Sequence, residues 1–149
     1  MTISISFYKN ATPFTIKELA KKFKKFGDVY EETYAGILIK SEVPIYGFKK
    51  AFRSDGFGNR IVNLIVPPQT QVNFSLDDGG KCRAEQAFVH SIYDIEKKKE
   101  VKTAYSGWDT SFKYNKHHIV KPRYSFDETT RSCNSGIHFY LDLRSALDY

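Results

Sequence analysis

The sequence predicts an α+β fold with a mixed, largely antiparallel sheet, an N-terminal amphipathic helix and a short C-terminal helix. Three observations support this prediction. Residues 15–26 have the apolar periodicity of a helix, the chain from residue 29 onward alternates β-rich runs with turn signals, and a capped apolar segment follows Asp142. Aromatic residues make up 15% of the chain, and this composition favours strands over helices elsewhere.

The N-terminal helix is the clearest local prediction. Thr15 and Glu18 have the spacing of a capping box, in which each side chain binds a free backbone N–H group of the first turn. Gly27 is expected to end the helix. Upstream, residues 3–7 alternate apolar and serine side chains as in a half-buried strand, so residues 1–43 are interpreted as a basic strand–helix extension. The apolar residues of the helix share one face: Ile16, Leu19, Ala20, Phe23 and Phe26.

From residue 29 onward the chain is expected to form strands divided by Gly, Pro and Asp turn signals. Glu96–Glu100 is predicted to be a polar hairpin tip, and Asp142 is a candidate N-cap for the closing helix. The length of 149 residues fits a single domain over residues 1–149. The predicted strands are Gly36–Lys40, Ile45–Phe52, Asn59–Val66, Ala87–Ile95, Val101–Tyr105, Phe112–Tyr114, His118–Val120 and Gly136–Leu141.

The formal net charge of +6 lies mainly in the first part of the chain. Residues 1–60 carry 11 Lys and Arg against 6 Asp and Glu, whereas residues 61–149 carry 12 against 11. Such a surface attracts an acidic partner, a phosphate backbone or a membrane surface, or it is a solvated face. No signal peptide and no apolar run of about 18 residues occur, so we expect a protein that is not secreted by a signal peptide and has no membrane partner.

Cys82, His90, Cys133 and His138 are the candidate metal-ligating residues. Zinc binds four nitrogen or sulfur ligands, and this set would supply them. However, the spacings lack a close C-x2–4-C pair, and Cys133 and His138 would point to opposite faces of one strand. We therefore expect no metal and two buried, reduced cysteines. A thiolate of Cys133 activated by His138 lacks a positioned third group, and the sequence contains no other complete catalytic set.

A basic, aromatic-rich loop surrounds the two adjacent histidines. Aromatic rings interleaved with cations stack bases and hold phosphates. Neither an RNA-recognition sequence nor a recognition helix accompanies this loop, so nucleic acid is the less favoured partner. The residues of the loop are Tyr114, Lys116, His117, His118, Lys121 and Tyr124.

One sequence motif, Cys133-Asn134-Ser135-Gly136-Ile137-His138-Phe139-Tyr140, resembles an uncharacterised domain of large DNA viruses and phages. That domain is often appended to pentapeptide-repeat proteins, although this chain carries no such repeats. The resemblance covers about residues 44–149 and implies a viral or phage origin and viral protein partners, without an established activity. Shorter matching segments are Gly47–Lys49, Leu64–Pro67, Lys81–Ala84, Ala87–Val89, Tyr105–Ser106, Phe112–Tyr114 and Phe126–Asp127.

The segment Gly136–Tyr140 is also similar to the Gly-Ile-Tyr-Phe strand of ADP-ribosyltransferases, which flanks their nicotinamide pocket. Three departures weaken this similarity: neither His nor Arg precedes Gly47, His138 replaces the strand tyrosine, and no strand follows Tyr149 to bring the usual glutamate. The resemblance implies an NAD site formed by Tyr46, Gly47, Tyr105, Ser106, Gly136, His138 and Tyr149.

The favoured interpretation is a non-enzymatic viral interaction or structural protein, such as a minor virion or capsid component. It would act in the host cytoplasm or the virion through tyrosine-rich surfaces, which suit protein contacts. On this interpretation we expect neither catalytic residues nor a cofactor. The alternative is an ADP-ribosyltransferase-like protein that binds NAD, either active or degenerate.

Overall fold

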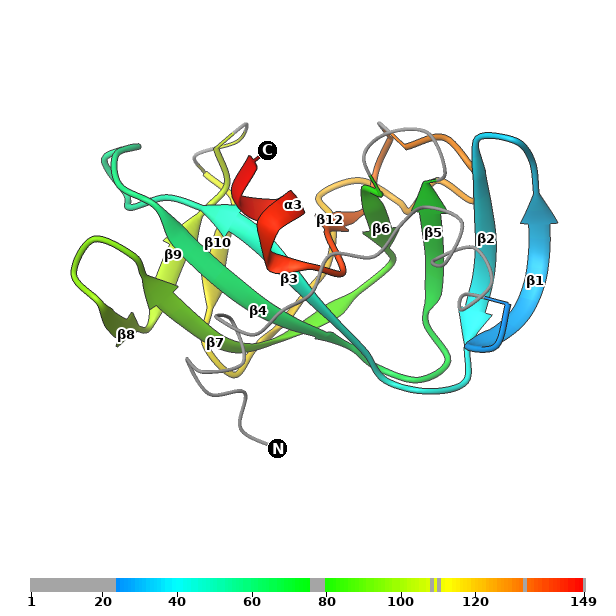
Figure 1. Cartoon of the computed structure of the whole chain (residues 1–149), viewed down its shortest axis with the longest axis horizontal. Coiled ribbons are helices and arrows are strands. Elements are labelled where there is room, and N and C mark those ends of the chain that lie inside the picture. Colours follow the sequence, from blue (N-terminus) through cyan, green and yellow to red (C-terminus); the bar gives the residue numbers. More distant parts are fainter. Residues whose placement is uncertain (1–23, 76–79, 108, 110, 133, 149) are drawn as a thin grey trace.

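The computed structural model describes residues 24–75, 80–107, 109, 111–132 and 134–148. These residues form strands arranged mainly as two antiparallel sheets, with one short helix near the C-terminus (Figure 1). The prediction of an α+β fold with a mixed sheet is wrong, because the described part is essentially all-β and its strand pairings are antiparallel. The largely antiparallel pairing and the short C-terminal helix are confirmed.

The predicted N-terminal helix and the strand at residues 3–7 lie mostly or wholly outside the described residues. Of the helix, only residues 24–26 are described, and they form a turn that leads into β1 (Gly27–Glu32). Gly27 was expected to end a helix but begins this strand instead. A Cβ atom on Gly27 would lie 1.8 Å from the carbonyl oxygen of Lys40, so the close approach of these strands requires glycine.

The first sheet has the strand order β1-β2-β5-β6-β12. Its strands alternate between a face in the main core and a face that carries polar side chains. On β2, for example, Ile37 and Ile39 are fully buried in that core. Besides β1, the strands are β2 (Gly36–Ser41), β5 (Gln71–Ser75), β6 (Cys82–Ala84) and β12 (Ile137–Phe139).

The second sheet has the order β11-β7-β4-β3, and β8 also pairs with β7. The register of β4 and β7 shifts at His90, because Asn63 lies opposite Ser91 whereas Leu64 lies opposite Val89. A hairpin tip between β7 and β8 is present as predicted, but it covers residues 95–98 and not Glu96–Glu100. The predicted strand Val101–Tyr105 is divided, because β8 ends at Val101 and residues 103–105 pair elsewhere. The strands are β3 (Ile45–Ala51), β4 (Arg60–Val66), β7 (Ala87–Asp94), β8 (Lys99–Val101) and β11 (Ile119–Val120).

The two sheets meet at Tyr140, the residue after β12. Its backbone exchanges hydrogen bonds of 2.8 and 2.7 Å with Phe48 on β3. A separate hairpin of β9 (Thr103–Tyr105) and β10 (Lys113–Asn115) joins the end of β3 through a bridge between Phe52 and Tyr105. These bridges place β12 and the hairpin beside the same edge of β3.

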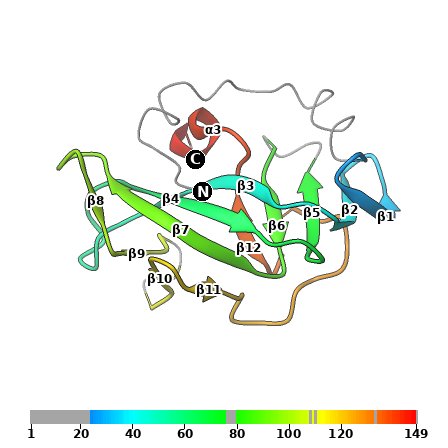
Figure 2. The ribbon, with the colours of Figure 1, turned by 90° about the horizontal axis from the view of Figure 1, so that it is seen from below.

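Helix α3 (Leu143–Asp148) lies on one side of β3 and β4, and the hairpin β9–β10 lies with β11 on the other side (Figure 2). The helix begins as predicted, since a carboxylate oxygen of Asp142 accepts the backbone N–H of Ser145 at 2.8 Å. Beneath it, a small cluster contains Phe48, Ile61, Tyr140 and Ala146. The larger core cluster, on the opposite face of β3, includes residues from both sheets and the hairpin.

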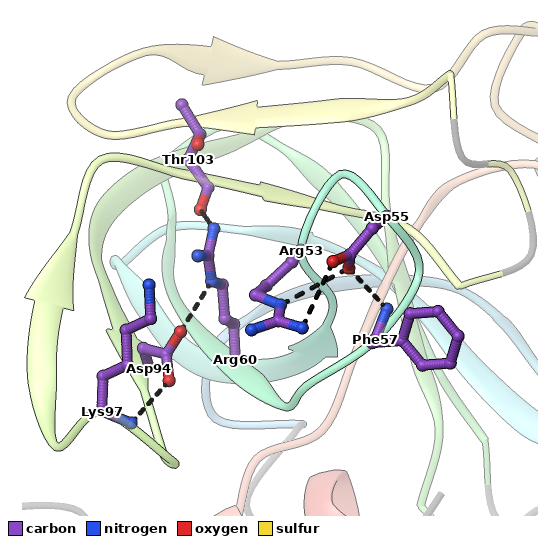
Figure 3. Close-up of polar contacts among 7 residues, drawn as sticks. All are labelled: Arg53, Asp55, Phe57, Arg60, Asp94, Lys97 and Thr103. Carbon is purple, nitrogen blue, oxygen red and sulfur yellow. Dashed lines mark hydrogen bonds and ion pairs between the residues drawn. The ribbon is translucent and has the colours of Figure 1, made fainter.

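A largely buried ion pair joins β4, β7 and β9 (Figure 3). The Nε atom of Arg60 lies 3.1 Å from Asp94, and Nη1 of Arg60 donates to the carbonyl of Thr103 at 2.8 Å. The other carboxylate oxygen of Asp94 accepts the backbone N–H of Lys97 at 2.9 Å. The side chains of Arg60 and Asp94 are 11% and 3% exposed, so this network fixes the β7–β8 turn against the sheet.

A second Arg–Asp pair lies in the neighbouring loop and is exposed. Arg53 lies 3.2 Å from Asp55, whose carboxylate also accepts the backbone N–H of Phe57 at 2.9 Å (Figure 3). The side chain of Asp55 is 53% exposed. The Arg60–Asp94 and Arg53–Asp55 pairs therefore consist of the same two chemical groups, but the first pair is largely buried and the second is exposed to solvent.

Within the part of the chain that the structure describes, no helix is long and apolar enough to span a membrane.

Candidate functional site: a cationic cavity

A cavity of about 350 Å³ opens where the hairpin β9–β10, the segment 122–124 and β12 meet beside β3. Aromatic and apolar side chains form part of its lining: Phe112, Tyr114, Pro122, Tyr124 and Ile137. Cationic and polar residues complete it, and they come from one strand of each sheet and from loops: Lys49, Lys81, Ser106, Asp109, Arg123, Ser135, Gly136 and His138. The cavity thus combines a surface for a ring with several positive charges.

Lys49 lies on the face of β3 that points to the main core. Strand alternation places it on the same side as Ile45 and Ala51, both of which belong to that core. Its partner across the sheet is Val62, which is fully buried. Burial lowers the pKa of Lys49 to about 8, and the nearby charge of Lys81 acts in the same direction. The ammonium group therefore exchanges its proton close to neutral pH.

Lys81, Arg83 and His138 lie on one face of the first sheet. Lys81 and Arg83 are two residues apart, and Arg83 lies directly opposite His138 in the register of β6 and β12. The side of β6 that carries Cys82 faces the core instead. Lys81 is 5% exposed, which is unusual for a lysine. This face therefore concentrates positive charge next to the cavity.

His138 is a neutral imidazole in this setting. Burial lowers the pKa of His138 to about 4, although its hydrogen bond to the carbonyl of Asn134 acts in the opposite direction. The charges of Lys49, Lys81 and Arg83 lower the pKa further. Because Nε2 lies 2.7 Å from the Asn134 carbonyl, that nitrogen carries the proton and Nδ1 is left as an acceptor.

Arg83 organises the segment that forms one wall of the cavity. Its side chain is fully buried, and its guanidinium donates to four backbone carbonyls at 2.7–3.0 Å: those of Asp127, Thr129, Arg131 and Ser135. The ring of Phe126 lies 5.1 Å from the guanidinium carbon. Since Ser135 and Gly136 line the cavity, Arg83 sets the position of that wall.

The carboxylate in the described lining is already paired. Asp109 lies 3.1 Å from Nη2 of Arg123 and accepts hydrogen bonds from the backbone and hydroxyl of Ser111. The hydrogen bond from the Ser111 hydroxyl is the main cause that holds the pKa of Asp109 below its ordinary value, and desolvation acts in the opposite direction. The described lining thus contains three cationic side chains and one carboxylate, so its electrostatic field is positive.

The structure brings together three of the seven residues that the resemblance to ADP-ribosyltransferases implies. Ser106, Gly136 and His138 line the cavity. Gly47 instead packs under the ring of Phe139, where a Cβ atom would lie 2.3 Å from Cδ2. Tyr46 is half-buried on the opposite face of β3 from Lys49, the ring of Tyr105 lies 5.9 Å from the ammonium group of Lys113, and Tyr149 is outside the described residues.

The candidate metal ligands lie apart. Cys82 is buried on β6, where burial raises the pKa of its thiol and Sγ lies 3.3 Å from the Gly80 carbonyl. His90 is at the bulge of β7, and His138 is on the opposite sheet face from Cys82. Cys133 is outside the described residues. Across the described ranges, no group of three or more His, Cys, Asp or Glu side chains is arranged to hold a metal ion.

The basic, aromatic loop proposed for nucleic acid is divided between two locations. Tyr114 is 3% exposed and belongs to the core, so its ring cannot stack on a base. The ring of His117 stacks on Phe88 at 6.2 Å. Tyr124 is 75% exposed at the cavity, away from the hollow lined by Lys116, His117 and His118.

Comparison with known protein families matches residues 29–146 to DUF5758, described as a family of unknown function. The chain belongs to this family. The DUF5758 match begins within β1, so residues 29–43, which were assigned to an extension from the sequence, are part of the matched region. Membership fits the resemblance to an uncharacterised domain, whereas viral origin and a pentapeptide-repeat context stay predictions. Searches of curated proteins and of solved structures found no match.

Sequence reasoning missed Lys49 and Lys81 as site residues of this DUF5758 protein. A signal for Lys49 was present, because it occupies a core-facing position in the alternation Ile45, Gly47, Lys49, Ala51. A charged residue at such a position needs a partner or a function. For Lys81 the sequence contains no local pattern of this kind, since residues 77–80, which precede it, are interpreted as a turn.

Proposed function

We propose that this DUF5758 protein is a non-enzymatic binding protein, and that its cationic cavity holds the anionic group of a small molecule. The observation that carries the proposal is Lys49 on the core face of β3, beside Lys81, in a cavity whose described carboxylate already pairs with Arg123. Burying a cation costs free energy unless it meets an opposite charge. A bound phosphate or carboxylate group would offset that cost.

The remaining lining favours a ligand that carries a ring as well as an anion. Phe112 and Tyr124 offer aromatic surface, and Ser106 offers a hydroxyl group, whereas the Ser135 hydroxyl donates to the Tyr124 carbonyl at 2.8 Å. A volume of about 350 Å³ lies within the range of small-molecule sites. Mononucleotides have this combination of an aromatic base and a phosphate, and NAD has it as well.

Isothermal titration calorimetry with inorganic phosphate, adenosine monophosphate and NAD tests this proposal. We expect saturable binding of at least one of them, weakened about tenfold or more by Lys49→Gln and by Lys81→Gln, because a hydrogen bond to a charged group contributes roughly 1.5–3 kcal/mol. Lys50→Gln is the matched control, since Lys50 follows Lys49 in the chain but lies on the other face of β3. Absence of binding by all three probes, or binding unaffected by the two cavity substitutions, would contradict the proposal.

The titration with NAD distinguishes the non-enzymatic proposal from the ADP-ribosyltransferase-like alternative. Tight binding of NAD with weak binding of the mononucleotide would favour the ADP-ribosyltransferase-like alternative. Comparable binding of both would indicate that the phosphate and one ring are the recognised groups. Hydrolysis of NAD during the titration, detected by released nicotinamide, would contradict a non-enzymatic role.

Protein interaction is the second candidate function, and two exposed tyrosines favour it. Tyr30 on the edge strand β1 is 59% exposed, and Tyr34 in the following turn is 92% exposed. Tyrosine contributes a large contact area at low entropic cost, so such residues suit interfaces. The test is a pull-down comparing the wild type with a Tyr30→Ser/Tyr34→Ser double variant. Capture of the same proteins by both forms would remove this role for the two tyrosines.

A further inference from the structure

We propose that Lys49 is a reactive amine that captures a carbonyl compound as a covalent imine, with the anionic group of that compound held beside Lys81. The inference rests on the proposed function and names the class of ligand: an aldehyde or ketone that also carries a phosphate or carboxylate. Its basis is the placement of one lysine inside a cationic cavity that is large enough for such a molecule.

The position of Lys49 separates it from other lysines of the described chain. Lys24 and Lys116 pair with Glu32 and Glu100 at 2.9 and 3.6 Å. Lys50 donates to the carbonyl of Leu147 at 3.4 Å. Within the described ranges, the Nζ atom of Lys49 has no carboxylate at ion-pair distance. Its nitrogen is therefore open to a ligand that enters the cavity.

The surroundings of Lys49 also favour the uncharged amine, which is the nucleophilic form. Lysines become nucleophiles when they are desolvated or lie next to another cation. Both conditions are met, because Lys49 lies on a core-facing strand position and Lys81 is its neighbour. With a pKa of about 8 rather than 10.5, a substantial fraction of Lys49 is uncharged at physiological pH.

Imine formation balances without an oxidant or a further reactant. The nitrogen lone pair of Lys49 attacks the carbonyl carbon, and the C=O π electrons move to oxygen. Transfer of a proton from nitrogen to that oxygen gives a carbinolamine. Loss of the hydroxyl group and the second amine proton as one water molecule leaves the C=N bond. His138 is neutral and donates its Nε2 proton to Asn134, so it adds no third ammonium-like charge beside the reacting nitrogen.

Pyridoxal 5′-phosphate is a suitable probe because it combines an aldehyde, a ring and a phosphate. The full-length protein would be incubated with this probe, reduced with borohydride and mapped by peptide mass spectrometry. We expect about one equivalent at Lys49, formed at least tenfold faster than with pyridoxal, which lacks the phosphate. Inorganic phosphate should slow the reaction, and the rate should rise with pH and level off above about 8, because the uncharged amine reacts.

Three variants test whether the labelling by pyridoxal 5′-phosphate is specific for Lys49. Lys49→Arg keeps the positive charge but should abolish the adduct, and Lys81→Gln should slow its formation. Lys50→Arg should leave the labelling of Lys49 unchanged. An adduct spread evenly over several lysines, or labelling of Lys49 equally fast with pyridoxal, would overturn the inference.

The outcomes also separate this inference from the proposed function. If calorimetry shows anion binding that depends on Lys49 while Lys49 is not labelled, the imine is wrong and the anion site stands. If Lys49 is labelled by pyridoxal 5′-phosphate and calorimetry shows no binding of inorganic phosphate, the carbonyl is required for capture. If neither binding nor selective labelling is observed, both proposals are wrong.

Discussion

Replacing Arg83 with methionine is expected to lower the free energy of unfolding by about 4 kcal/mol, because a hydrogen bond from a charged donor contributes roughly 1.5–3 kcal/mol and partly buried acceptors would lose their donor. Four backbone carbonyls accept from this guanidinium, and all four belong to the segment 127–135. Urea unfolding followed by tryptophan and tyrosine fluorescence measures the change.

Arg131→Met is the matched control for this substitution. Arg131 lies in the same segment, but its side chain is exposed and its role is to present a backbone carbonyl to Arg83. A change within about 0.5 kcal/mol is expected there, as for most surface positions. Equal losses in the two variants would mean that Arg83 does not organise the segment.

The variant Arg83→Lys shows whether stability depends on the hydrogen-bonding geometry of the guanidinium or only on its positive charge. Arg83→Lys keeps the positive charge but has only three donors on a single nitrogen, so it cannot reach the four carbonyls. We expect it to remain clearly less stable than the wild type. In Arg83→Met, removal of the charge should also raise the pKa of His138 above about 4, which NMR titration of the imidazole would detect.

Replacing Asp94 with asparagine is expected to lower the free energy of unfolding at pH 7 by about 3 kcal/mol, the lower end of the range for breaking a buried ion pair. Asp94 is almost fully buried, and its two oxygens accept from Arg60 and from the backbone of Lys97 (Figure 3). Asparagine has one acceptor oxygen and no charge, so Arg60 would lose its counterion.

Asp55→Asn provides the matched control, because Asp55 also pairs with an arginine and accepts a backbone N–H, but in solvent. Solvent screens an exposed pair, so its loss should matter far less. Similar losses at the two positions would contradict the importance of burial for the Arg60–Asp94 pair.

The effect of Asp94→Asn should depend on pH. Burial favours the neutral acid, but the hydrogen bonds from Lys97 and Arg60 and the charge of Arg60 outweigh it and keep the pKa of Asp94 below its ordinary value. The unfolded chain therefore binds the proton first, at a pKa near 3.9, as pH falls. The stability difference between wild type and variant should be complete above that pH and shrink below it. A difference that is the same at pH 7 and pH 3 would contradict this assignment.

The strands that sequence patterns predicted well are those with an apolar run and a turn signal at each end. β3, β4 and β7 are such strands, and their observed bounds differ from the predicted ones by a residue or so. β1 was missed although it pairs with the next strand, β2, because its exposed residues show no apolar alternation. β5 and β6 were missed, because each has a partner far away in the chain, β2 for β5 and β12 for β6. β6, for instance, is three residues long and carries the fully buried Arg83, which no local pattern marks as part of a core.

The end of the predicted N-terminal helix was wrong for a physical reason too. The prediction took Gly27 as the end of an amphipathic helix, of which residues 15–23 lie outside the described part of the chain. In the structure Gly27 is instead required by the close passage of β1 over Lys40. A glycine marks backbone freedom or close approach, and only the tertiary neighbours decide which of these applies.

The candidate site was predicted in part. Gly136–Leu141 was expected to form a strand, and the structure places β12 at Ile137–Phe139 within it. His138, one of the residues implied for an NAD site, lines the cavity, but an NAD site there stays a prediction. The neighbours of His138 there, Lys49 and Lys81, come from positions 89 and 57 residues earlier in the chain, and a single sequence gives no measure of such proximity. The site depends on the pairing of β12 with β6 and the bridge from Tyr140 to β3.

The most direct test of the cationic cavity as an anion site is an NMR titration of the Lys49 side chain, with and without a saturating phosphate-bearing ligand. In the free protein we predict a pKa of about 8. An anion bound beside the ammonium group favours its charged form, so the pKa should rise on binding, and the protein should take up a proton at pH 8. A pKa near 10.5 in the free protein that does not move when phosphate or adenosine monophosphate is added would contradict the account.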